Sequence, residues 1–488
     1  MRGASIAGAG FALTQAIGLG FYIVMARLAG PAVFGAFAAA TALPGFASLF
    51  AESGMQGALI QRRDRIEEAA ATAVIATFAA GIGLSLVALA LAPLVGLYFD
   101  DSEIGLAAAA LSGILFLNAI TAVPDALMQR RFSFLRRVIV DPLNMLTYGI
   151  VSTALLAAGL GLWGLVIGLY AAKIVRVLAA WLLARWRPQL GLASFEMWRE
   201  LVSFGRHVVA SEFLREIGTM ANIALVGRVF GVAPLGQFRF GHRLAAQAST
   251  PIVVASAYVL FPAFSRIADD EERLRAAALR SFRILAVAVF PISLALVPLG
   301  AQLVLLLLGD QWDQAGRILA ALCGLTAALP LTQTASELCK ATGAPRFLTR
   351  ISGLAAITSI VSLLAAAPFG IVAVAAGLSV ASLVVAAYSL RAAAPILRVP
   401  LGGIVRQLLP PALAATAAAG LVCLLQQIGV FGSPTATWRL LGLIVIEGGL
   451  FFCTYILTLA AISPAMLVET IRIVPTSRLR ALVRRRAS

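Results

Sequence analysis

Long apolar runs alternate with short polar connections along almost the whole chain. A helix needs about twenty mostly apolar residues to cross the hydrocarbon core, where every backbone polar group must be satisfied internally. The pattern predicts an all-α polytopic membrane protein with about fourteen transmembrane helices. The expected spans are 4–26, 33–57, 70–98, 104–128, 138–158, 161–184, 204–228, 233–262, 283–308, 315–340, 349–367, 370–390, 408–429 and 438–461.

Composition supports a membrane protein. The chain is 61% hydrophobic and only 12% charged, about half the charge that a soluble protein of this length carries. The net charge of +16 comes from arginines placed between the apolar runs rather than on one amphipathic face, so we expect no nucleic-acid partner. The four cysteines lie singly in apolar segments, and no motif for a metal, a nucleotide or another cofactor is found.

The distribution of arginine predicts the orientation. Connections after even-numbered spans are rich in arginine, whereas those after odd-numbered spans are short and often acidic, such as the one with Asp100, Asp101 and Glu103. By the positive-inside rule, both termini and the basic tail at 462–488 are expected in the cytoplasm of a bacterium, with the spans in its inner membrane.

An internal repeat predicts two parallel lobes. Residues 26–37 align without gaps to residues 227–238, with identical Arg, Gly, Ala, Gly and Phe at a constant offset of 201 residues. Six spans separate the copies, so both halves keep one orientation, as in transporters with parallel repeats. The expected parts are an N-lobe at 1–184, an interfacial linker helix at 185–203, a C-lobe at 204–390, a C-terminal helix pair at 391–461 and the tail. Phe195, Trp198, Leu201 and Val202 are expected on the apolar face of the linker helix.

Ionisable side chains inside a membrane are costly and mark candidate functional sites. The seventh span carries Glu212, Arg215, Glu216 and Asn222 at helical spacing, and the eighth carries Arg239, His242 and Arg243. Two such stripes at similar depth could line one cavity. Simple salt bridges between the helices are the alternative, but three arginines and a histidine exceed the two carboxylates, which favours an anionic ligand. Arginine binds phosphate with two parallel hydrogen bonds.

Other polar residues are scattered over the spans. Lys173 in the sixth span is expected to add to the cationic site, and Glu52 in the second is the candidate for a protonatable coupling residue, because no basic residue lies one turn away. Arg176, one turn from Lys173, could add to the basic character of the cavity or extend toward the cytoplasmic interface. Asp125 and Glu337 are better explained by hydrogen bonds between helices.

Several segments resemble the polysaccharide transporter family of the multidrug/oligosaccharidyl-lipid/polysaccharide flippase superfamily, which includes O-antigen and exopolysaccharide flippases. They are residues 26–31 (ARLAGP), 34–35 (FG), 57–62 (GALIQR), 124–132 (PDALMQRRF), 260–266 (LFPAFSR) and 308–312 (LGDQW). The resemblance implies fourteen helices, two six-helix lobes with a C-terminal pair, and movement of an undecaprenyl-diphosphate-linked oligosaccharide to the outer leaflet by alternating access. Membrane lipids, and a polysaccharide polymerase or glycosyltransferases, are the partners that such a protein would meet.

Two other functions compete with this interpretation. A cation-coupled multidrug exporter of the same superfamily would favour acidic cavity residues, yet the first expected span has none. A membrane enzyme acting on lipid-linked glycans would need catalytic groups, commonly on a long outer loop, and the loops after odd-numbered spans are short and lack histidine. The residues therefore favour a transporter over a catalyst. They leave the sugar, the coupling ion and the oligomeric state open.

Overall fold

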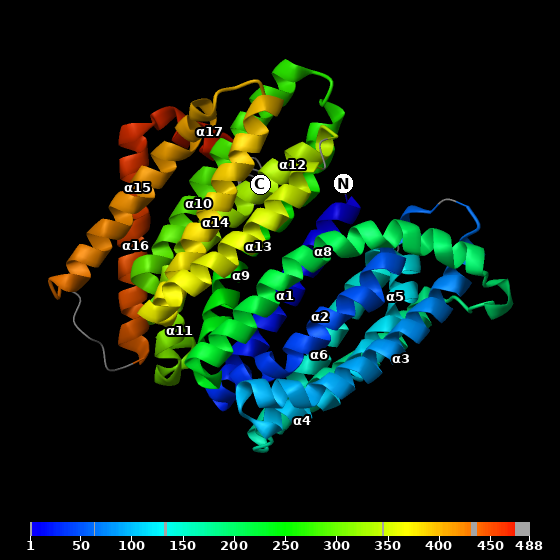
Figure 1. Ribbon diagram of the computed structural model, residues 1–488. Helices are drawn as coiled ribbons and strands as arrows, with labels where there is room; N and C mark the ends of the chain where they lie inside the picture. Colours follow the sequence, from blue (N-terminus) through cyan, green and yellow to red (C-terminus); the bar gives the residue numbers. More distant parts are fainter. Residues whose placement is uncertain (1, 63, 131–133, 344–345, 431–436, 474–488) are drawn as a thin grey trace, which may run out of the picture. The chain divides into compact units, whose positions relative to one another are not determined.

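The computed structural model describes residues 2–62, 64–130, 134–343, 346–430 and 437–473, and in these ranges its regular structure is helical (Figure 1). The α-helices are α1 (Arg2–Leu28), α2 (Pro31–Gln61), α3 (Ile66–Phe99), α4 (Ser102–Leu111), α5 (Ile114–Arg130), α6 (Phe134–Ala157), α7 (Gly161–Ala184), α8 (Phe195–Phe230), α9 (Val232–Arg266), α10 (Glu271–Leu308), α11 (Asp313–Ala321), α12 (Cys323–Ala341), α13 (Arg346–Ala366), α14 (Ile371–Ile396), α15 (Leu401–Gln427), α16 (Thr437–Ile462) and α17 (Pro464–Ile473). Short 3₁₀ turns occupy Leu190–Leu192, Asp310–Trp312 and Ala367–Phe369.

The described helices confirm a polytopic membrane protein, although the count of fourteen spans is not confirmed. Eleven helices are long and apolar enough to cross a membrane, or twelve if α11 and α12, which meet at 47°, form one bent span. The remaining two expected spans correspond to α1 and α8. Side chains of α1 are described only from Thr14 onward, and α8 carries the polar stripe that lowers its hydropathy.

The linker between the expected lobes is continuous with the span that follows it. The Ser194 hydroxyl accepts a hydrogen bond from the Met197 amide and so caps the start of α8. The helix does not stop before 204, however, and its 36 residues span about 54 Å, well beyond a hydrocarbon core of about 30 Å. The segment expected as a linker helix is thus the beginning of α8, and its interfacial role stays a prediction.

The expected apolar face of that first segment is correct only in part. Phe195, Trp198 and Val202 are exposed, as an interfacial face requires. Leu201 is instead buried with Met197 in a core cluster built from α2, α3, α5 and α7. One side of this segment thus packs on protein, and the other is available to the membrane interface.

Contacts between helices divide the chain into two compact units. The first comprises residues 1–240, 307–314 and 355–371, and in it α1 packs on α6, α6 on α7, and α2 on α5 and α8. The second comprises residues 241–306, 315–354 and 372–488, and α15 packs on α16 there. These units are defined by contacts between residues and not by the internal repeat. The lobe boundaries expected from the sequence therefore stay a prediction.

The order of the helices repeats along the chain. Helices α1 to α7 are followed by α8 to α14 with similar lengths in the same order. The correspondence includes an irregularity: α4 and α5 are separated by a break at Ser112 and Gly113, and their counterparts α11 and α12 by a break at Leu322. A shared interruption of a span is a structural sign of the internal repeat.

Within the first unit, the two copies of the repeat contact each other reciprocally. A Cβ atom on Gly35 of α2 would overlap the carbonyl oxygen of Val232, and one on Gly236 of α9 would overlap that of Pro31. Both pairs are related by the offset of 201 residues found in the sequence. Because residue 35 meets the counterpart of residue 31, and the reverse, the ends of α2 and α9 cross about a local pseudo-two-fold axis.

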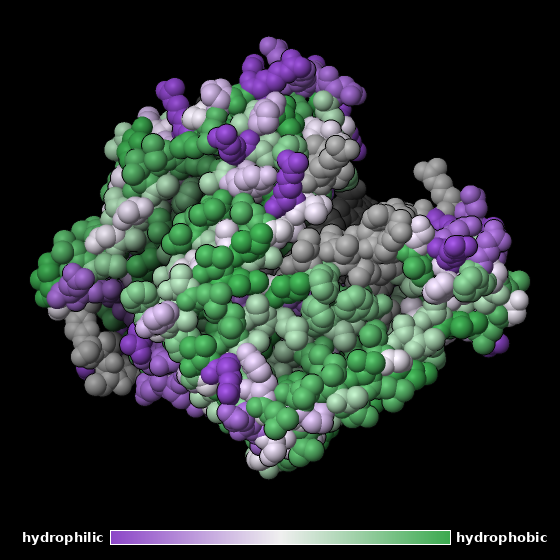
Figure 2. Space-filling model, in the orientation of Figure 1, coloured by the Kyte–Doolittle hydropathy of each residue, from purple (hydrophilic) through white to green (hydrophobic). Residues whose placement is uncertain are grey.

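Apolar side chains also cover much of the outside. Figure 2 shows broad hydrophobic areas on one face, with hydrophilic residues gathered in smaller patches. Large exposed hydrophobic residues recur on α3, α7, α14 and α16, among them Leu97, Leu182, Val380 and Leu457. Such patches exceed those of monomeric soluble proteins and are expected of a surface that faces lipid.

Candidate functional site

Three basic side chains lie on one face of α9. Arg239, His242 and Arg243 are spaced i, i+3 and i+4, so their Cβ atoms are neighbours on the helix surface. Arg239 is exposed, and the other two are half-buried. Counted from Val232, Arg243 lies about 16 Å along the helix, which is roughly the middle of a bilayer core.

The polar stripe of α8 is described in part. Glu216 is half-buried. The Asn222 amide donates to the carbonyl oxygen of Gly218 at 2.7 Å and to the Ser359 hydroxyl of α13 at 3.1 Å, both within the first unit. The side chains of Arg215, Glu212 and Glu52 lie outside the described residues. A substrate role for Asn222 and Glu216 therefore stays a prediction.

The expected cationic residues do not all belong to one compact unit. Arg239 is part of the first unit, whereas His242 and Arg243 are part of the second. Lys173 is half-buried on α7 in the first unit, one turn before Arg176. Arg239, His242 and Arg243 share α9, and a common site for them stays a prediction. A cavity shared by α8 and α9 remains a prediction from the sequence.

Arg176 forms an ion-pair cluster inside the first unit. Its guanidinium lies 2.7 Å from a carboxylate oxygen of Asp125 on α5 and 3.6 Å from one of Asp141 on α6. The side chains of Arg176 and Asp125 are only 28% and 18% exposed. Bonding between helices, expected from the sequence for Asp125, is confirmed, whereas its partner Arg176 was expected at the cavity or at the cytoplasmic interface. Asp141 was missed, although an acidic residue before Pro142 inside an apolar span was a usable signal.

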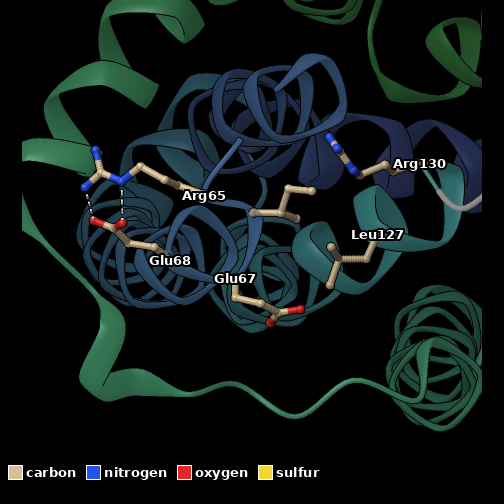
Figure 3. A pocket seen from close by; sticks show the side chains of 6 residues that line it. Arg65, Glu67, Glu68, Leu127 and Arg130 are labelled. Carbon is tan, nitrogen blue, oxygen red and sulfur yellow. Dashed lines mark hydrogen bonds and ion pairs between the residues drawn. The ribbon is translucent and has the colours of Figure 1, made fainter. Parts of the chain in front are cut away.

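A pocket of about 600 Å³ lies where α3 begins and α5 ends, lined by Arg65, Ile66, Glu67, Glu68, Leu127 and Arg130 (Figure 3). The Arg65 guanidinium donates two hydrogen bonds of 2.7 Å to Glu68, which raise the pKa of Arg65 above its usual value. The Trp186 indole donates to Glu67, and Arg130 donates to the backbone carbonyl of Arg62. These contacts tie the turn after α7 to the start of α3, which is a structural role.

The described residues offer little for metal chemistry. In this part of the chain, no three His, Cys, Asp or Glu side chains lie close enough to hold a metal ion.

A polar pair in the second unit was not predicted from the sequence. Gln426 of α15 and Glu447 of α16 are joined by a 2.8 Å hydrogen bond. Glu447 was detectable as the single charged residue in the interior of the last long apolar run.

Comparison with known sequences links the chain to polysaccharide export. Residues 24–317 match the family described as polysaccharide biosynthesis protein. The succinoglycan biosynthesis transport protein ExoT of Rhizobium meliloti (strain 1021) is 26% identical over 311 residues, and the lipopolysaccharide biosynthesis protein WzxC of Escherichia coli (strain K12) is 24% identical over 320 residues. Each alignment covers 63% of this chain and 63% of the relative, less than two thirds of its length.

Comparison with solved structures identifies the fold. The lipid II flippase MurJ in an inward closed conformation has a TM-score of 0.78 at 12% identity, covering 95% of this chain and 99% of that one. An inward-facing multidrug resistance MATE family transporter of the MOP superfamily has a TM-score of 0.63 at 17% identity, covering 79% of this chain and 94% of that one. At these identities the likeness extends to the fold alone.

Proposed function

The chain belongs to the family of polysaccharide biosynthesis proteins, and from this premise we propose that it flips a polyprenyl-diphosphate-linked oligosaccharide across the bacterial inner membrane. The observation that carries the proposal is the face of α9 with Arg239, His242 and Arg243 at the depth of the bilayer core. Ionisable side chains within a membrane span are rare and mark candidate functional sites, and the excess of basic over acidic groups in this stripe favours an anionic ligand.

The diphosphate is the part of the substrate that this face fits. Two guanidinium groups one turn apart can each donate two parallel hydrogen bonds to phosphate oxygens. We assign Arg215 and Lys173 to the same site and leave the glycan to polar residues such as Glu216 and Asn222. The polyprenyl chain stays in lipid. The names of the relatives, which concern succinoglycan and lipopolysaccharide, support a glycan as the cargo.

We further propose that the repeat provides alternating access. The lobes at 1–184 and 204–390 would rock against each other, with the C-terminal pair at 391–461 beside them. The reciprocal approach of Gly35 and Gly236 to the other repeat supports a joint that closes one end of the path. Both termini are assigned to the cytoplasm, where glycosyltransferases would deliver the substrate. A polymerase on the other side of the membrane would receive the exported substrate.

A multidrug exporter is the second candidate, because a MATE transporter shares the fold. Organic cations would be repelled by Arg239 and Arg243, which favours the anionic cargo. A membrane enzyme is a weaker alternative, since the relatives include a protein named for transport.

The deciding experiment measures translocation of a lipid-linked oligosaccharide diphosphate in liposomes with the purified chain. Wild type is compared with Arg215→Ala, Arg243→Ala and Arg439→Ala at matched insertion. Arg439 is a suitable control, because it is an exposed arginine that lies over the Trp438 ring near the start of α16.

We expect the first two variants to lose most translocation and the control to retain it. Loss of one bidentate arginine–phosphate contact of about 2 kcal/mol corresponds to a reduction of roughly thirtyfold. Equal activity in all four proteins would exclude these arginines from the site. Expulsion of organic cations without movement of the glycolipid would favour the multidrug exporter.

A further inference from the structure

Glu447 is a fully buried carboxyl group in the middle of α16. Its exposed fraction is 0%, and it lies ten residues, about 15 Å, from the start of the helix at Thr437. Its surroundings in the second unit are apolar: Val422 of α15, Phe451 and Tyr455 of α16 and Leu299 of α10 belong to one core cluster. A Cβ atom on the adjacent Gly448 would contact Leu299 at 3.8 Å, so α10 and α16 meet at this level.

One oxygen of this carboxyl group is satisfied and the other is not. The Gln426 side-chain amide donates to Glu447 Oε2 at 2.8 Å and to the backbone oxygen of Pro298 at 3.1 Å, which bridges α15, α16 and α10. No donor or acceptor reaches the buried Oε1 atom from the described residues. One turn beyond Pro298, the Oε1 atom of Gln302 is also buried without a partner.

An ionised Glu447 would be uncompensated here. No described Lys or Arg forms an ion pair with it, and a lone charge at such depth costs several kcal/mol. Glu337 of α12 provides the contrast. It is also buried, with 5% of its side chain exposed, but it lies 3.0 Å from the Lys340 ammonium group and accepts a hydrogen bond from Gln333.

We propose that Glu447, held by Gln426, whose amide also donates to the carbonyl of Pro298, is a proton-binding site that couples proton movement to export. The coupling part rests on the proposed flippase function; the proton site itself does not. Binding a proton converts the carboxylate into a neutral acid, whose O–H gives the unsatisfied oxygen a hydrogen to donate. An unpaired acceptor on the same face of α10, Gln302 Oε1, suits that donor.

The two protonation states favour different packing of the C-terminal helix pair. The neutral acid fits between α10, α15 and α16 as they stand. Loss of the proton places a negative charge near the Pro298 carbonyl and among apolar side chains, which favours separation of α16 from α10 and entry of water. A proton at this site therefore biases the docking of α15 and α16 on a helix of the transporting core.

Few other ionisable groups face this site. On α15 the nearest ionisable group is Cys423, one turn before Gln426. On α16 the nearest ionisable groups after Glu447 are Cys453 and Tyr455. The Tyr455 hydroxyl donates to the Val287 carbonyl of α10. Arg439 lies two turns before Glu447 and points over Trp438. On α10 the charges of Arg280 and Arg283 are paired with Glu469 of α17, far along the helix from Pro298.

Dicyclohexylcarbodiimide tests the site directly, because this apolar reagent modifies carboxyl groups that are protonated and buried in apolar surroundings. The full chain in nanodiscs is treated over a range of pH and the modified residue is identified by mass spectrometry. We expect Glu447 to be labelled, Glu447→Gln to lose this labelling, and Glu337, which is paired with Lys340 at 3.0 Å, to remain unmodified. Absence of label at Glu447 at acidic pH, with the variant equally folded, overturns the proposal.

The effect of sodium ions on labelling distinguishes a bound proton from a bound alkali cation. Labelling that falls as pH rises but is indifferent to sodium chloride supports a proton, whereas protection by sodium at constant pH assigns the site to an alkali cation and overturns it. In liposomes, an imposed proton gradient should change the rate at which wild type translocates the glycolipid, and should not change the rate for Glu447→Gln. If Glu447 is labelled but wild type and Glu447→Gln respond equally to the proton gradient, the coupling role is excluded. If wild type translocates no glycolipid, the flippase proposal is contradicted, while the labelling result still shows the proton site.

Discussion

At the scale of single residues, burial decides what a charge contributes. The Arg176–Asp125 and Arg228–Asp100 pairs have the same separation of 2.7 Å, but the first is mostly buried whereas the second has side chains that are 52% and 77% exposed. Water and salt screen the exposed pair, and a buried charge that loses its partner cannot recover hydration. Sequence reasoning found Arg176 and Asp125, but neither their distance nor their burial.

Asp125→Ala is therefore expected to lower the free energy of unfolding by about 2 kcal/mol, because it removes the 2.7 Å ion pair of the mostly buried Arg176. Asp100→Ala should change it by about 0–1 kcal/mol. Denaturant unfolding of the purified protein in mixed micelles measures both. In the double variant Asp125→Ala with Arg176→Ala, the losses should be clearly less than additive; additive losses would mean that the two side chains do not stabilise each other.

At the scale of helices, small residues decide how closely two elements approach. Gly35 and Gly236 were visible in the sequence only as identities within a repeat. In the structure they allow α2 and α9 to cross with their backbones in contact. A side chain at either position would have to push the other helix away.

Gly35→Ala and Gly236→Ala are expected to destabilise this crossing by about 1–3 kcal/mol through overpacking. Gly45→Ala is the matched control, since it lies in the same helix and a Cβ there meets nothing within 4 Å. It should be neutral or stabilising by up to about 1 kcal/mol. Thermal unfolding and disulfide trapping between cysteines placed at positions 31 and 236 report on the crossing. Equal behaviour of all three variants would contradict the close approach.

At the scale of the whole molecule, the repeat and the charge distribution together predict a topology. Helices that recur in the same order after six spans give parallel copies, and arginine-rich connections on one side give them a direction. Aspartate-rich turns follow α3 and α10, the third element of each copy.

Cysteine accessibility tests this topology. In a variant without the four native cysteines, Asp64→Cys should react with a membrane-impermeant thiol reagent only from the cytoplasmic side, and Ser102→Cys only from the outside. Both positions are exposed, and they lie beyond opposite ends of α3. Labelling of both from one side would refute the assigned orientation.

The sequence by itself determined the class of this protein, because the length and apolarity of its runs leave a helix as the only element that satisfies the backbone in lipid. It also predicted the repeat and the shared helical face of Arg239, His242 and Arg243, which depend on local spacing. Only the tertiary structure decided that Arg176 binds Asp125 and Asp141, that Gly35 and Gly236 carry a backbone crossing, and that Glu447 has an unsatisfied oxygen. These are distances between residues far apart in the chain, and local patterns hold no information about them.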